Sequence, residues 1–128
     1  MPPVTVFVCT TCRRSGDAQD APRAGAALAA NAASLAGPDL AIRPVECLGN
    51  CSRGPTAAIA APGGWTYVFG NLDPAEAAPA LQEGARLLAA AEGQVMPWRG
   101  RPEPLKRGLI ARIPPLEHDR RRPERPEA

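Results

Sequence analysis

The sequence predicts a small α/β domain with a mixed sheet, whose elements follow the order β-α-β-β-β-α. The first observation is "VTVFV" (Val4 to Val8), a short β-branched run typical of a central buried strand. The second is a crossover of about 30 residues with room for one helix, which implies that the first two strands are parallel. The third is a pair of strand-like segments around a Pro-Gly-Gly turn. At 128 residues the chain fits one such domain.

The crossover is predicted to contain an alanine-rich helix. Asp20 is the expected N-cap, and Pro22 is tolerated in the first turn. The helix carries "AGAALAANAASLA" and is expected to end at Gly37-Pro38. "LAIRPVE" follows as the second strand. Pro44 indicates an edge strand or a strand end, because proline cannot donate to the hydrogen-bond ladder.

The second half of the domain is predicted to be a hairpin followed by a helix. "TAAIA" and "WTYVFG" form the hairpin on either side of residues 62–64. "DPAE" at 73–76 is an acidic N-cap with Pro at N1 and Glu at N3. Pro79 predicts that this first turn is separate from, or kinked against, the following helix. That helix presents one face at helical spacing and closes at Gly93; the face consists of Leu81, Ala85, Leu88 and Glu92.

Composition predicts a light core and a cytoplasmic location. Hydrophobic residues make up 45% of the chain, but only two Phe, two Trp and one Tyr supply large packing groups. A metal or a cross-link would therefore stabilise the domain substantially. The chain has no run of eighteen apolar residues and no basic region before its N-terminal apolar run, so neither a membrane span nor a signal peptide is expected. In the reducing cytoplasm, four cysteines indicate metal or redox chemistry.

Charge and proline content divide the chain into a domain, residues 1–96, and a basic C-terminal extension, residues 97–128. Residues 1–96 carry six Arg and eight acidic residues, a net of −2, and residues 97–128 carry nine basic and five acidic residues, a net of +4. Residues 117–128 are expected to be disordered. For residues 98–116 the sequence leaves two alternatives open, a solvated tail or a segment docked on the domain or on a partner.

The four cysteines fall into two pairs, each directly after a predicted strand. Cys9 and Cys12 form C-x2-C, and Cys47 and Cys51 form C-x3-C. Because parallel strands end at the same edge of a sheet, the predicted fold brings both pairs together there. Four thiolates in one site suit an iron–sulfur cluster or a structural Zn²⁺.

Two further alternatives are a "CTTC" dithiol and four buried, inert cysteines. A dithiol of the C-x-x-C type works best where a helix starts at its first cysteine, and here "RRSGDAQDAP" delays the helix. It also leaves Cys47 and Cys51 without a role. Inert cysteines would sit in the core, whereas both pairs lie in loops rich in Gly, Arg, Ser and Thr.

The residues around the cysteines indicate an electron carrier, not an enzyme. Gly49 frees the loop backbone to direct its N–H at sulfur, and Arg13, Arg14 and Arg53 either stabilise a reduced centre or are solvated surface. The single histidine, His118, lies in the C-terminal tail, so general-base chemistry has no obvious donor. The sequence contains no phosphate-binding fingerprint.

The motif "CLGNCSRGP" resembles the second cysteine pair of the thioredoxin-like [2Fe-2S] ferredoxins and of the matching small subunit of respiratory complex I. The chain also resembles a bacterial family of unknown function described as predicted metal-binding proteins, through "VFVCTTC", "CLGNCSRGP", "WTYVFG" and "LKRGLIARIPPL". That family is sometimes encoded near cobalamin-biosynthesis genes. The resemblance implies a thioredoxin-like fold and a [2Fe-2S] cluster, with Zn as the alternative metal.

The resemblance also implies ligands and partners. Cys9, Cys47 and Cys51 match the ferredoxin ligands, whereas Cys12 replaces a ligand that ferredoxins usually place further along the loop. A redox partner protein and a homodimer are implied. Nucleic acid is not expected, because the acidic body lacks an aromatic stacking platform, and no membrane is expected.

Overall fold

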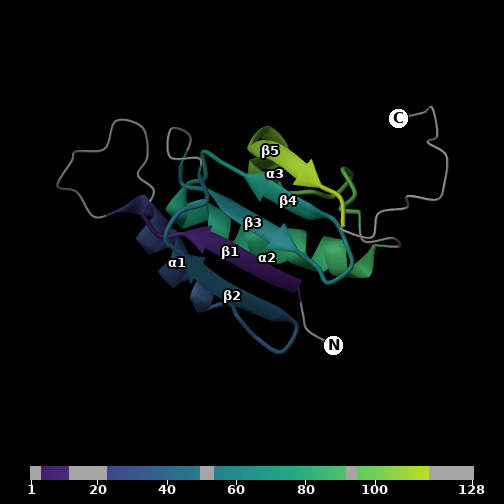
Figure 1. The fold of residues 1–128 in the computed structure, drawn as a ribbon, viewed down its shortest axis with the longest axis horizontal. Helices are drawn as coiled ribbons and strands as arrows, with labels where there is room; N and C mark the ends of the chain where they lie inside the picture. The colour runs from purple at the N-terminus through teal and green to yellow at the C-terminus, as the bar shows by residue number, and fades with distance from the viewer. Residues whose placement is uncertain (1–3, 12–22, 50–53, 92–94, 116–128) are drawn as a thin grey trace.

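The structure is a computed structural model that describes residues 4–11, 23–49, 54–91 and 95–115 (Figure 1). Within this part of the chain, five strands form one sheet and three helices accompany it. The elements are β1 (Val4–Cys9), α1 (Ala24–Ala33), β2 (Leu40–Val45), β3 (Ala57–Ala60), β4 (Thr66–Phe69), α2 (Pro74–Ala90), α3 (Glu103–Arg107) and β5 (Leu109–Ile113).

The sheet has the strand order β2-β1-β3-β4-β5 and is mixed. β1 and β2 are parallel, with Val4 opposite Leu40 and Cys9 opposite Val45, and their arrows point the same way in Figure 1. The other neighbours pair antiparallel. The predicted crossover, the β3–β4 hairpin and the edge position of the strand that contains Pro44 are all confirmed.

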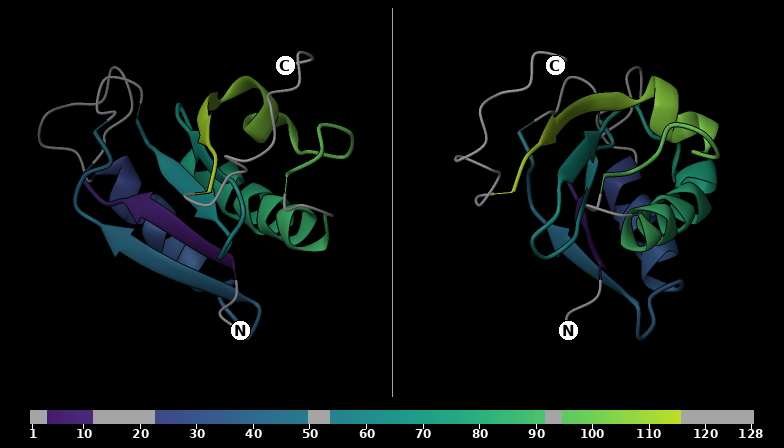
Figure 2. Two further views of the ribbon diagram at one scale, coloured as in Figure 1. Left: turned by 45° about the vertical axis from the view of Figure 1, so that its right-hand side comes forward. Right: turned by 90° about the vertical axis from the view of Figure 1, so that its right-hand side faces the viewer.

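The core lies between one face of the sheet and the helices. Figure 2 shows in its right panel that α1, α2 and α3 lie on the same side of the sheet. Alternate residues of β1 therefore differ in burial. Val4, Val6 and Val8 are buried under the helices, while Phe7 is half-buried on the opposite face. On that face Phe7 stands in register with Ala58 of β3, which pairs in turn with Val68 of β4.

Helix α1 is shorter than the sequence predicts at both ends. Its N-cap is Arg23, which has an extended backbone and no capping side-chain bond, so the expected cap at Asp20 is wrong. Asp20 itself lies outside the described residues. At the other end the helix stops at Ala33, and the Gly37 N–H donates to the Leu40 carbonyl at 2.9 Å. A hydrogen-bonded turn thus leads the chain from α1 into β2.

Helix α2 begins as predicted but continues through Pro79. The Asp73 side chain accepts a hydrogen bond from the Ala75 N–H at 2.8 Å, with Pro74 in the first turn. A separate first turn is wrong, since one helix spans Pro74–Ala90. Pro79 removes a single backbone N–H donor, and the packing of the helix outweighs that loss. The predicted face is buried at Leu81, Ala85 and Leu88; Glu92 and Gly93 lie outside the described residues.

The segment after α2 contributes a helix and a strand that the predicted element order lacked. β5 pairs with β4 and extends the sheet, and α3 packs on α2 through the fully buried Leu105. Of the two alternatives for residues 98–116, the structure therefore has α3 and β5 docked on the domain. Residues 117–128, expected to be disordered, lie outside the described part.

Two glycines permit this docking. A Cβ on Gly84 in α2 would lie 2.4 Å from a methyl carbon of Leu105. A Cβ on Gly108, between α3 and β5, would lie 2.6 Å from the Pro104 carbonyl oxygen and 2.7 Å from that of Gly70. Backbone atoms cannot move aside as a flexible side chain can, so Gly108 is the stricter requirement. The Gly108 carbonyl also accepts the Gly70 N–H at 2.8 Å, which joins β5 to the end of β4.

We predict that Gly108→Ala destabilises the protein by about 1–3 kcal/mol, because the added methyl group forces the backbone at the α3–β5 junction apart. Gly37→Ala is the matched control, since a Cβ there meets nothing within 4 Å. The measurement is the free energy of unfolding in urea. Equal stability of the two variants would contradict the assigned contact.

Candidate metal centre

The candidate site lies where the parallel strands β1 and β2 end. Cys9 is the last residue of β1 and is fully buried, so its expected position in a loop outside the core is wrong. Cys47 follows the end of β2 by two residues and is exposed. The register sets Cys9 opposite Val45. The fold thus brings Cys9 and the loop that carries Cys47 to one edge of the sheet, as the sequence predicts.

Hydrogen bonds hold the two loops against each other at this edge. The Cys9 thiol donates to the carbonyl oxygen of Glu46 at 3.4 Å, and the Thr11 hydroxyl donates to the same oxygen at 2.5 Å. The Thr10 N–H and hydroxyl both donate to the Val45 carbonyl, at 2.8 and 3.2 Å. The Glu46 carbonyl belongs to the peptide that leads into Cys47, so the sulfur of Cys9 contacts the backbone next to the second cysteine.

Gly49 directs a backbone donor at sulfur. Its φ is +80°, a left-handed conformation that favours glycine, and its N–H donates to the Cys47 Sγ at 3.2 Å. The expectation that Gly49 aims its N–H at sulfur is confirmed. A hydrogen bond to a thiolate stabilises the negative charge on sulfur, and such bonds set the potential of sulfur-ligated metals.

The start of β3 supports the site from the interior side. The Cys9 N–H donates to the carbonyl oxygen of Thr56, a fully buried residue, at 3.0 Å. Before Thr56, the Gly54-Pro55 peptide is cis, and the Pro55 carbonyl accepts the Leu72 N–H at 3.2 Å. The end of β1, residues 54–56 and Leu72 are therefore joined by hydrogen bonds on the interior side of Cys9.

The other predicted site residues fall outside the described part of the chain. These are Cys12, Cys51, Arg13, Arg14, Arg53 and His118. Residues 4–11, 23–49, 54–91 and 95–115 contain no group of three or more metal-ligating side chains. Helix α1 begins only at Ala24, so its N-terminus does not lie at Cys9, where a thioredoxin-type dithiol works best.

Sequence reasoning missed the hydroxyl and guanidinium groups that organise the first loop. Besides the Thr10 and Thr11 bonds, Arg23 Nη1 donates to the Thr11 carbonyl at 2.7 Å and ties the start of α1 to the end of β1. The signal for the threonines was present in "CTTC", where two hydroxyl residues follow a cysteine at a strand end. The Arg23 contact joins residues twelve positions apart in the sequence, so no local pattern predicts it.

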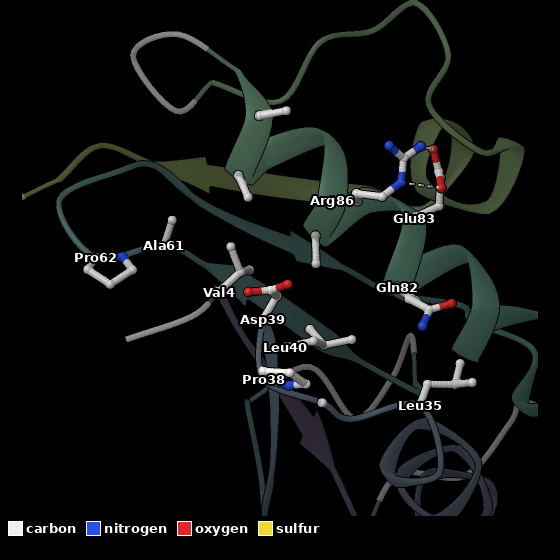
Figure 3. Close-up of a pocket in the computed structure, with 14 residues that line it drawn as sticks. Val4, Leu35, Pro38, Asp39, Leu40, Ala61, Pro62, Gln82, Glu83 and Arg86 are labelled. Atoms are coloured by element: carbon white, nitrogen blue, oxygen red, sulfur yellow. Dashed lines mark hydrogen bonds and ion pairs between the residues drawn. The ribbon is translucent and has the colours of Figure 1, made fainter. Parts of the chain in front are cut away.

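A pocket of about 720 Å³ lies at the opposite edge of the sheet, away from both described cysteines (Figure 3). Val4 and Leu40, at the starts of β1 and β2, line it together with the second half of α2. Arg86 lies at the side of the pocket, paired with Glu83, and this contact raises the pKa of the guanidinium.

In the part of the chain that the structure describes, no helix is long and apolar enough to cross a membrane.

Known structures share this fold. A thioredoxin-like [2Fe-2S] ferredoxin from Aquifex aeolicus matches with 20% identity and a TM-score of 0.53, covering 91% of this chain and 98% of that one. A second structure, of the wild-type thioredoxin-like [2Fe-2S] ferredoxin from the same organism, matches with 19% identity and a TM-score of 0.53, covering 87% and 99%. At these identities the likeness establishes the fold, which is thioredoxin-like as the sequence predicts.

A comparison with curated proteins gave no match. The family model described as "Protein of unknown function (DUF1636)" matches residues 6–115, and the chain belongs to this family.

Proposed function

We propose that the protein is an electron carrier that binds one [2Fe-2S] cluster through Cys9, Cys12, Cys47 and Cys51. The observation that carries the proposal is the meeting of Cys9 with the Cys47 loop at one sheet edge, where the Gly49 N–H donates to sulfur. The thioredoxin-like fold, which solved [2Fe-2S] ferredoxins share, supports it.

The donor chemistry of the described residues fits such a cluster. Cysteine thiolates are the usual ligands of [2Fe-2S] clusters, which supply a one-electron couple when bound. A reduced cluster carries one more negative charge, so the N–H of Gly49 favours reduction. The Thr11 hydroxyl oxygen lies 3.8 Å from the Cys9 sulfur and can rotate its proton toward a thiolate there.

The burial of the two cysteines suits exchange of electrons with another protein. Cys9 is enclosed by the strand ends, whereas Cys47 is exposed at the surface. A centre held between them is anchored in the fold on one side and reachable on the other. A carrier of this kind works with a redox partner protein, and we propose a protein partner, with a homodimer as the assembly. The link to cobalamin or metal-cofactor metabolism rests on the family resemblance alone.

We predict that protein purified without oxygen is reddish-brown and contains about two iron and two acid-labile sulfide per chain. Cys47→Ala should abolish the visible absorption, and because the side chain is exposed the fold should survive. The measurements are metal and sulfide analysis with visible and far-UV circular dichroism spectra. A colourless protein with one bound zinc would replace the proposal with a structural zinc site, and a metal-free protein with a redox-active thiol pair would replace it with a dithiol.

A comparison of two glycine variants separates the effect of the Gly49 hydrogen bond on the midpoint potential from the effect of backbone strain on stability. Gly49 and Gly63 both have positive φ, +80° and +73°, and a Cβ at either position meets nothing within 4 Å. Alanine at either site should therefore cost a similar strain, about 1–2 kcal/mol. Only Gly49→Ala should also lower the midpoint potential, because relief of the strain turns its N–H away from Cys47.

The measurements are urea unfolding of the metal-free chains and protein-film voltammetry of the loaded ones. A midpoint potential that is unchanged in both Gly49→Ala and Gly63→Ala would show that the N–H does not tune the centre. A potential lowered to the same extent in both variants would assign the change to general loosening of the domain.

A further inference from the structure

A basic surface with an exposed aromatic residue lies on the segment that precedes and includes α3. Residues 95–115 contain five basic residues and one acid, Glu103, a net of +4. The rest of the described chain contains three arginines and five acids, a net of −2. Trp98 is 58% exposed, which is unusual for so large an apolar side chain. We call Trp98, Arg99, Lys106 and Arg107 the Trp98 surface.

Arg101 fixes this surface to the core. Its side chain is only 7% exposed, and its guanidinium donates to the Met96 carbonyl at 2.7 Å and to the Pro97 carbonyl at 3.1 Å. The Met96 N–H donates to the Tyr67 hydroxyl oxygen at 2.9 Å. The guanidinium also lies over the Tyr67 ring, 5.5 Å from its centroid. Burial lowers the pKa of Arg101, but an arginine stays charged at neutral pH. A loop held at so many points is preorganised for binding.

Cations border the exposed indole. The Arg101 guanidinium lies 5.1 Å from the centre of the Trp98 ring, and the Lys106 ammonium lies 5.3 Å from it. These cation–π contacts orient the ring. Tryptophan and arginine are the residues most enriched at the energetic centres of protein–protein interfaces. The chemistry therefore favours a protein partner over a nucleic acid.

We propose that the Trp98 surface docks an acidic protein, with carboxylates of the partner around an apolar side chain that packs on Trp98. The strand order sets β4 and β5 at the opposite end of the sheet from β2, and Figure 1 shows α3 on that distant side. The cysteine pair Cys9 and Cys47 instead belongs to the ends of β1 and β2. The proposal does not depend on which metal the cysteines bind.

The test uses the full chain and fluorescently labelled poly-glutamate, with and without a central leucine, and reads binding by anisotropy. Arg99→Glu with Arg107→Glu should weaken binding about tenfold or more, and added salt should weaken it in the unaltered protein. Arg43→Glu with Arg86→Glu is the matched control, because it changes the net charge equally at exposed positions outside the Trp98 surface, and it should weaken binding less than about twofold. Trp98→Ala should weaken binding of the leucine peptide only.

Four outcomes would overturn the proposal. The unaltered chain fails to bind either peptide at low salt, or the two double variants lose affinity equally, which makes the effect one of net charge. An oligothymidylate binds more tightly than the peptides and loses affinity with Trp98→Ala, which makes the surface a nucleic-acid site. Light scattering shows a dimer that Trp98→Ala dissociates, which makes a second copy the occupant. Circular dichroism checks that the variants, all at exposed positions, retain the fold.

Discussion

The parallel pairing of β1 with β2 is the constraint on which the rest of the molecule depends. A parallel pair requires a crossover, and the crossover places α1 on one face of the sheet. The same pairing makes both strands end at one edge, where Cys9 meets the Glu46 carbonyl. An antiparallel pair would have sent the two loops to opposite edges. The choice of strand direction thus determines both the helix layer and the composition of the site.

The second organising feature is the close approach of α3 to α2. Gly84 has no side chain, so Leu105 can enter the helix layer and be fully buried. With Leu105 in place the chain reaches the outer edge of β4 and adds β5. A core with few aromatic residues in this way gains buried apolar surface from a segment rich in proline and basic side chains. The same segment then presents Trp98 at the surface.

The sequence allowed those parts of the fold to be predicted that depend on local chemistry. Pro44 marked the edge strand, Asp73 the start of α2, and the two cysteine pairs the ends of parallel strands. Gly49 could be assigned its donor role because only glycine readily adopts the required φ. β5 could not be predicted, because a short run between prolines becomes a strand only when a free strand edge offers hydrogen bonds. The continuity of α2 through Pro79 likewise depends on tertiary packing.

The strand order also has a consequence for the nascent chain. β1 lies second in the sheet, between β2 and β3, yet it is synthesised first. Its apolar residues have no partner strand until residues 40–45 have been made, and none on the other side until residues 57–60 follow. Cys9, whose side chain is completely buried in the finished protein, can therefore be enclosed only after both of these segments have been made.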